Sequence, residues 1–96
     1  MDKRKSYDIL KKEGINMTKM EYKKCEKLME EAINKAHKSR DDFNKAERYL
    51  QDGDEAAHKE FQRKGDQLYG YSVAINQVLV SLRFKHARMK ELSDLL

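Results

Sequence analysis

Few residues of this 96-residue chain have the types and spacing that catalysis or metal binding requires. The single cysteine, Cys25, has no C-x-x-C partner, and no H-E-x-x-H run includes His37 or His58. The adjacent carboxylates Glu30-Glu31 and Asp41-Asp42 are typical of a solvated helix face rather than of an acid–base pair. We therefore expect no enzyme activity and no bound metal or cofactor.

Basic residues offer the second kind of candidate chemistry. The chain carries 21 Lys and Arg against 17 Asp and Glu, and the excess is concentrated near the N-terminus. A basic stripe is the usual electrostatic footprint of a nucleic-acid-binding protein. Acidic residues are interleaved with it, however, and no helix-turn-helix spacing is present. Nucleic-acid binding is therefore the alternative function, and its candidate residues are Lys3, Arg4, Lys5, Lys11 and Lys12.

The composition favours an all-α protein. Charged residues make up 40% of the chain, there is no proline, and only four glycines occur. No apolar run approaches the roughly 20 residues that a membrane-spanning helix needs, and no apolar signal region follows the basic N-terminus. A lone cysteine is typical of a reducing compartment, so we expect a cytoplasmic location.

A first long helix is predicted over residues 18–52. Thr18 and Glu21 have the spacing of a capping box, and Asp52-Gly53-Asp54 is a turn signal. Between them, apolar or small residues recur at alternating steps of three and four, which is the pattern of a helix-packing seam. The seam residues are Tyr22, Cys25, Met29, Ala32, Ala36, Ser39, Phe43, Ala46 and Leu50.

A second long helix is predicted over residues 54–84, with Asp52 and Glu55 repeating the capping spacing. Its seam is Ala57, Phe61, Lys64, Leu68, Tyr71, Ile75, Val78 and Leu82. Folding at Gly53 brings the two seams together as layers, in which Leu50 faces Ala57, Ala46 faces Phe61, Phe43 faces Lys64, Ser39 faces Leu68, Ala36 faces Tyr71, Ala32 faces Ile75, Met29 faces Val78 and Cys25 faces Leu82. Large residues mostly meet small ones, as in well-packed helix pairs. An antiparallel hairpin is favoured over one continuous helix in an intermolecular coiled coil, because Gly53 interrupts the helix.

A second apolar stripe on residues 54–84, made of Tyr69, Val73, Val80 and Phe84, requires a cover. The chain ends are one source: a short N-terminal helix over residues 1–16 and a short C-terminal helix over residues 86–96. A second copy that completes a dimeric four-helix bundle is the other source. We slightly favour the homodimer, because two arms alone bury little apolar surface.

Protein binding is the function that these apolar residues favour, since aromatic side chains are frequent interface anchors. The candidate partner-binding residues are Tyr69, Val73, Val80, Phe84, Leu92 and Leu95. The competing interpretation is that the stripe and the C-terminal leucines cover each other within one chain.

Residues 60–83 contain Gly65-Asp66-Gln67-Leu68-Tyr69-Gly70-Tyr71 and Ala74-Ile75-Asn76-Gln77-Val78-Leu79. This segment resembles the C-terminal helix of small uncharacterised proteins from phages and mobile elements of Gram-positive bacteria. Some small proteins of that origin inhibit host defences, including CRISPR nucleases, by occupying a protein surface. The resemblance implies a stoichiometric inhibitor in a bacterial cytoplasm. The chain is also similar in length to the secreted Trp-x-Gly helical hairpins, but it has no tryptophan and lacks their defining motif.

Overall fold

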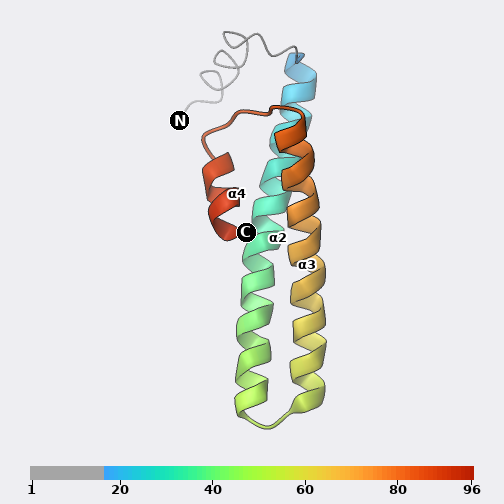
Figure 1. Cartoon of the computed structure of the whole chain (residues 1–96), viewed down its shortest axis with the longest axis vertical. Helices are drawn as coiled ribbons and strands as arrows, with labels where there is room; N and C mark the ends of the chain where they lie inside the picture. The colour runs from blue at the N-terminus through green and yellow to red at the C-terminus, as the bar shows by residue number, and fades with distance from the viewer. Residues whose placement is uncertain (1–16) are drawn as a thin grey trace.

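The computed structural model describes residues 17–96, which form the helices α2 (Lys19–Gln51), α3 (Glu55–Ser81) and α4 (Met89–Leu95). The two long helices pack side by side as an antiparallel hairpin, and α4 lies against α2 (Figure 1). The described part is elongated, at 55 × 21 × 16 Å, and contains no strand. The predicted all-α hairpin is thus confirmed, whereas the helix predicted over residues 1–16 lies outside the described residues.

Local hydrogen bonding begins each long helix. The Thr18 hydroxyl accepts a hydrogen bond from the Glu21 amide at 3.1 Å, and the Glu21 carboxylate reaches back, as the capping box predicts. Gly53 has a φ of 81°, a left-handed conformation that favours glycine. Asp54, not Asp52, caps α3, since its carboxylate accepts from the Ala57 amide at 3.1 Å.

The predicted seam of α2 is correct except near the tip of the hairpin. Seven of its nine residues are buried and Phe43 is half-buried. Leu50 is instead 53% exposed. It lies in the last turn of α2 and lines an open surface pocket with Glu47, His58 and Gln62.

The predicted seam of α3 is wrong by one residue at every second position. Ala57 is half-buried, and Lys64, Tyr71, Val78 and Leu82 are exposed. The buried residues are Gly65, Ser72, Ile75 and Leu79. Both patterns share Phe61, Leu68 and Ile75 and alternate steps of three and four. Gly65 is buried in place of Lys64, and Ser72 is buried in place of Tyr71. In both cases the smaller residue faces α2, because small side chains let the two helix backbones approach.

Three side chains contact main-chain carbonyl oxygens of the facing helix and set the register. Ser39 Oγ donates to the Gly65 carbonyl at 2.8 Å, and Ser72 Oγ donates to the Ala32 carbonyl at 2.9 Å. His58 Nδ1 lies 2.7 Å from the Ala46 carbonyl oxygen. On each helix these residues are seven apart, so the contact repeats once per heptad. These hydrogen bonds join residues three positions from the predicted layers, in which Ser39 faces Leu68 and Ala32 faces Ile75. Phe43, by contrast, contacts Gly65, the neighbour of its predicted partner Lys64. Buried hydroxyls require a partner, and the carbonyls of the facing helix supply it.

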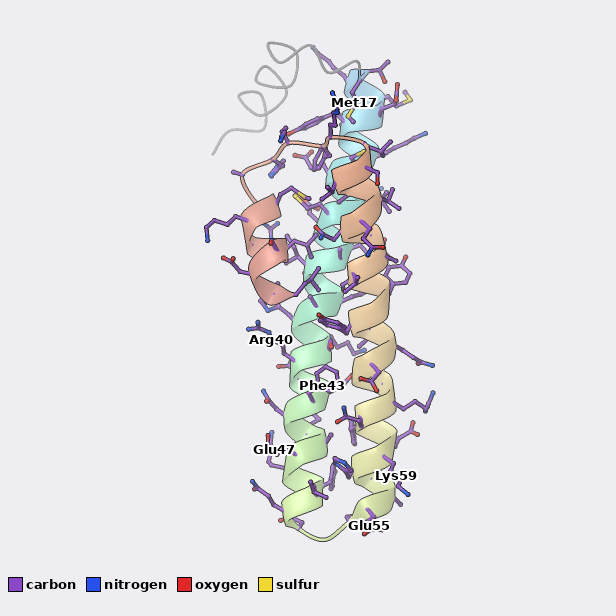
Figure 2. All side chains as sticks on the ribbon, viewed as in Figure 1. Met17, Arg40, Phe43, Glu47, Glu55 and Lys59 are labelled. Atoms are coloured by element: carbon purple, nitrogen blue, oxygen red, sulfur yellow. The ribbon has the colours of Figure 1, made fainter. Side chains whose placement is uncertain are left out.

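Phe43 packs against Gly65 at the interface of the two long helices; Figure 2 shows Phe43 between them. A Cβ atom added at Gly65 would lie 2.6 Å from Cε1 of Phe43, which is too close for the ring to remain in place. At Gly70, five residues on in the same helix, an added Cβ would meet no described atom within 4 Å. These two glycines therefore differ in whether the structure tolerates a side chain.

Replacing Gly65 by Leu is expected to lower the free energy of unfolding by about 1–3 kcal/mol, because overpacking forces the helices apart. The matched control, Gly70→Leu, is expected to raise it by up to about 1 kcal/mol, because Leu favours helix over Gly. Urea unfolding followed by circular dichroism measures both. If the two variants were equally stable, the close approach at position 65 would be disproved.

α3 ends at Ser81, so the predicted helix to residue 84 is too long. Arg83 has a φ of 57°, and the Phe84 amide donates to the Leu79 carbonyl at 3.0 Å, which closes the helix end. Phe84 then turns back into the core, where its ring centroid lies 5.1 Å from that of Tyr22. Burial of this ring offsets the cost of a left-handed conformation at Arg83.

The hydrophobic core lies at the open end of the hairpin. Its buried members come from all three helices and from the turn before α4: Tyr22, Cys25, Met29, Ala32, Ile33, Ile75, Leu79, Phe84 and Leu92. The tip is held by smaller contacts, such as the stacked rings of Tyr49 and Phe61 at 5.4 Å. The chain thus has a compact end and a slender two-helix end.

Candidate functional site

The six predicted partner-binding residues do not form one free surface. Phe84 and Leu92 are buried in the core, and Val73 and Leu95 are half-buried. Tyr69 is exposed, yet its hydroxyl donates to the Leu96 carbonyl at 2.8 Å. Only Val80, at 60% exposure, is largely open. The core and the C-terminal segment therefore cover much of the predicted stripe, and a partner-binding role for these residues stays a prediction.

Polar contacts help to hold the C-terminal segment against α2, but they contribute little of the stability of this packing. Arg40, seen beside α2 in Figure 2, donates to the Asp94 carbonyl at 3.2 Å, and His37 lies 3.7 Å from the Glu91 carboxylate. The Arg88 guanidinium, 2.9 Å from Glu91, holds the pKa of that carboxyl below its usual value. All these groups are exposed, and exposed ion pairs contribute little stability. Burial of Leu92 is what anchors α4.

A buried histidine–carboxylate contact joins α2 to the turn before α4. His86 Nε2 lies 3.0 Å from the Glu26 carboxylate, and the two side chains are 6% and 8% exposed. The Arg88 amide donates to His86 Nδ1 at 3.0 Å, so the ring proton is on Nε2 and points to Glu26. Both ring nitrogens are occupied, which makes His86 a structural clamp rather than a general base. The sequence patterns gave no sign of this pair, whose members are 60 residues apart.

Cys25 is also unsuited to chemistry. Its side chain is buried in the core. Burial raises the pKa of the thiol, and the Glu21 carboxylate raises it further. The reactive form of cysteine is the thiolate, so this thiol is a poor nucleophile at neutral pH.

Within residues 17–96, no group of three or more His, Cys, Asp or Glu side chains is arranged to hold a metal ion. None of the helices in that range is long and apolar enough to cross a membrane.

The most exposed cluster of large apolar side chains lies on a different face from α4. We call it the apolar strip: Leu28, Tyr71, Val78 and Leu82, which are between 36% and 51% exposed. Steps of seven and four place Tyr71, Val78 and the C-cap residue Leu82 on one side of α3. Tyr71, Val78 and Leu82 are the residues that the sequence pattern wrongly assigned to the seam.

Contacts around Tyr71 connect the two helices along this strip. Lys35 Nζ lies 4.7 Å from the Tyr71 ring centroid, and the Tyr71 hydroxyl donates to Glu31 at 3.0 Å. Leu28 precedes Lys35 by one heptad and Val78 follows Tyr71 by one heptad, so the antiparallel helices bring Leu28 and Val78 to the same level.

Towards the tip, the same face becomes an open basic groove of about 520 Å³. We call it the lysine groove: Lys35, Lys38, Lys45 and Lys64 surround Asp42, with Phe61, Leu68 and Tyr71 among the other lining residues. Tyr71 also belongs to the apolar strip, so the two features are continuous. The strip and the groove together occupy one side of the hairpin.

Asp42 is the most unusual residue in this groove. It is only 5% exposed, and its Oδ2 has no hydrogen-bond partner within residues 17–96. The expectation that both Asp41 and Asp42 are solvated is therefore wrong for Asp42. The signal was available in the seam of α2, since Asp42 lies three residues after Ser39 and next to Phe43, but a charged residue is normally assigned to the surface.

Comparison with known proteins produced no match to a protein-family model, to a curated protein or to a solved structure.

Proposed function

We propose that this protein is a non-catalytic binding protein that presents the apolar strip to another protein. One observation carries the proposal: four large apolar side chains, three of them at helical spacing, remain between 36% and 51% exposed. A folded protein that leaves such a row in water loses stabilisation, and contiguous apolar patches of this kind are typical of binding surfaces. Two adjacent helices also form a natural site for a third helix.

The side chains best suited to chemistry support binding over catalysis. Cys25 is buried, with a raised pKa, and His86 uses both ring nitrogens in structural contacts. The resemblance to small phage proteins implies a stoichiometric binder in a bacterial cytoplasm that inhibits a host defence protein. This role remains part of the proposal. A homodimer through the strip and nucleic-acid binding are the competing proposals. The N-terminal lysines of the latter lie outside the described residues.

Two valines on different sides of α3 provide the experiment. Val78→Glu places a charge in the apolar strip, and Val80→Glu places the same charge on the other side of the helix, where Val80 is 60% exposed. Both variants are expected to melt like the original protein, since both positions are exposed. Val78→Glu is expected to weaken capture of a protein from a Gram-positive bacterial lysate by more than about tenfold, because an unpaired charge would be buried on binding.

Val80→Glu is expected to leave that capture unchanged. Quantitative mass spectrometry of the captured proteins compares the variants, and sedimentation measures the oligomeric state. If Val78→Glu captured the same protein as efficiently as Val80→Glu, the apolar strip would not be the binding surface. A dimer that Val78→Glu converts to a monomer would favour the second-copy proposal instead.

A further inference from the structure

We infer that the apolar strip and the lysine groove form one continuous track for an amphipathic helix of the partner protein, apolar over the strip and acidic over the groove. This inference rests on the proposed function and adds the shape and charge of the partner segment. Its basis is the change in chemistry along one face of the hairpin, from Leu28, Val78 and Leu82 at the open end to four lysines nearer the tip.

The dimensions fit a single helix. The track runs along α3 from Phe61 to Leu82, which corresponds to about 32 Å at 1.5 Å per residue. A partner helix of about 21 residues has the same length. Placed between α2 and α3 and away from α4, it would complete a bundle in which each long helix has neighbours on both sides.

The charges favour an acidic occupant. Within residues 17–96, Lys35, Lys38 and Lys45 form no ion pair; Lys35 and Lys45 lie instead over aromatic rings, at 4.7 Å from Tyr71 and 5.5 Å from Phe61. Lys64 Nζ lies 3.7 Å from the Glu60 carboxylate and 5.1 Å from the Phe61 ring centroid. Carboxylates on a partner helix would pair with these ammonium groups and steer its approach, so that its direction along the track is determined.

Asp42 adds a requirement within the acidic half. A buried acceptor that lacks a donor costs stability, and the hairpin gains no described hydrogen bond from Oδ2 in return. A partner that brings one N–H donor to this position would satisfy the atom. The partner helix would therefore need one N–H donor opposite Asp42, between its acidic residues. A helix with an acidic residue at that position would be excluded.

Two other occupants suit the track less well. A second copy of this chain would set lysines against lysines in a parallel arrangement and lysines against the apolar strip in an antiparallel one. A nucleic acid would meet carboxylates at the open end of the track, where Glu30 and Glu31 lie with Lys24 and Lys27 around Leu28, and these carboxylates would repel its phosphates.

A display library of 21-residue helical peptides tests the inference on the full-length chain. Surface positions of the peptides are randomised among Glu, Lys, Ala and Leu. Sequencing of the selected peptides gives the frequency of each residue at each position. We expect Glu to be enriched in one half and Leu in the other. A synthetic copy of a selected peptide is expected to bind Lys35→Glu/Lys38→Glu at least about tenfold more weakly, by fluorescence anisotropy.

Lys59→Glu is the matched control, because Lys59 is exposed near the tip, does not line the groove and projects away from α2 in Figure 2. It should bind the peptide like the original protein. Asp42→Ala is expected to melt at a higher temperature and to bind the peptide more weakly. A lower melting temperature would overturn the role given to Asp42, since that residue would then serve the hairpin itself.

Several outcomes would overturn the inference. They are the absence of any selected helix, selection without Glu enrichment, or binding that is indifferent to the Lys35→Glu/Lys38→Glu change. Competition by a 21-nucleotide single-stranded DNA at 0.15 M salt, or a dimer that excludes the peptide, would assign the track to another occupant. If Val78→Glu abolished peptide binding while charge reversal had no effect, the proposed function would stand without this inference. If Val78→Glu also had no effect, both would fail.

Discussion

Replacing Leu79 by Ala is expected to lower the free energy of unfolding by about 2–5 kcal/mol. Leu79 is completely buried in the core between α2 and α3, so the shorter side chain removes apolar contacts and leaves a cavity. Its neighbour Val78 is 51% exposed, and Val78→Ala is expected to change the free energy of unfolding by less than about 0.5 kcal/mol.

Equilibrium urea unfolding of the two variants compares these values directly. The pair tests the register of the hairpin, because the sequence pattern assigns Val78 to the seam and the structure assigns Leu79. If Val78→Ala were the more destabilising of the two, α3 would be rotated towards the sequence-based arrangement. Both side chains sit in the same helix, so differences in helix propensity remain small beside the cavity effect.

Replacing Leu92 by Ala is expected to cost a similar amount, about 2–5 kcal/mol. α4 has only seven residues, too few to form a stable helix by itself, and Leu92 is its one buried side chain. Loss of this anchor should also expose core residues such as Ile33 and increase the fluorescence of a dye that binds apolar surface. The matched control is Leu82→Ala, because Leu82 is 49% exposed.

Leu82→Ala should leave both the unfolding curve and the dye fluorescence unchanged. If Leu92→Ala also left both unchanged, α4 would not be the cover of the core, and the dimeric bundle would become the better explanation. Together the two pairs separate residues that stabilise the fold, Leu79 and Leu92, from residues of the apolar strip, Val78 and Leu82. A change at the strip that weakens partner binding can then be attributed to the surface itself.

The local features of this protein were determined by its sequence. The capping box at Thr18 and Glu21, the turn at Gly53 and the seam of α2 depend on hydrogen bonds within a few residues and on the 3.6-residue repeat. Each of these signals is complete within a short segment. For that reason the hairpin and its all-α class could be predicted, and all but the tip of the α2 seam was correct.

The face that α3 presents to α2 was decided only in the tertiary structure. Two seams of equal periodicity overlap in that helix, and Tyr71 and Val78 give a stronger apolar signal than Gly65 and Ser72. The close approach of the helices reverses this preference, since Ser72 and Ser39 donate to carbonyls of the facing helix and Gly65 makes room for Phe43. Three residues displaced from the seam, Tyr71, Val78 and Leu82, became part of the apolar strip, which is why the candidate site was missed.

Other features of the structure depend on contacts between distant segments. Asp42 is buried beside α3, Phe84 leaves its helix to pack on Tyr22, and His86 pairs with Glu26 across 60 residues. A periodic pattern records the polarity of each residue but not the partner that will meet it. Burial of a charge, and exposure of a valine, are properties of two packed surfaces, so only the assembled helices determine them.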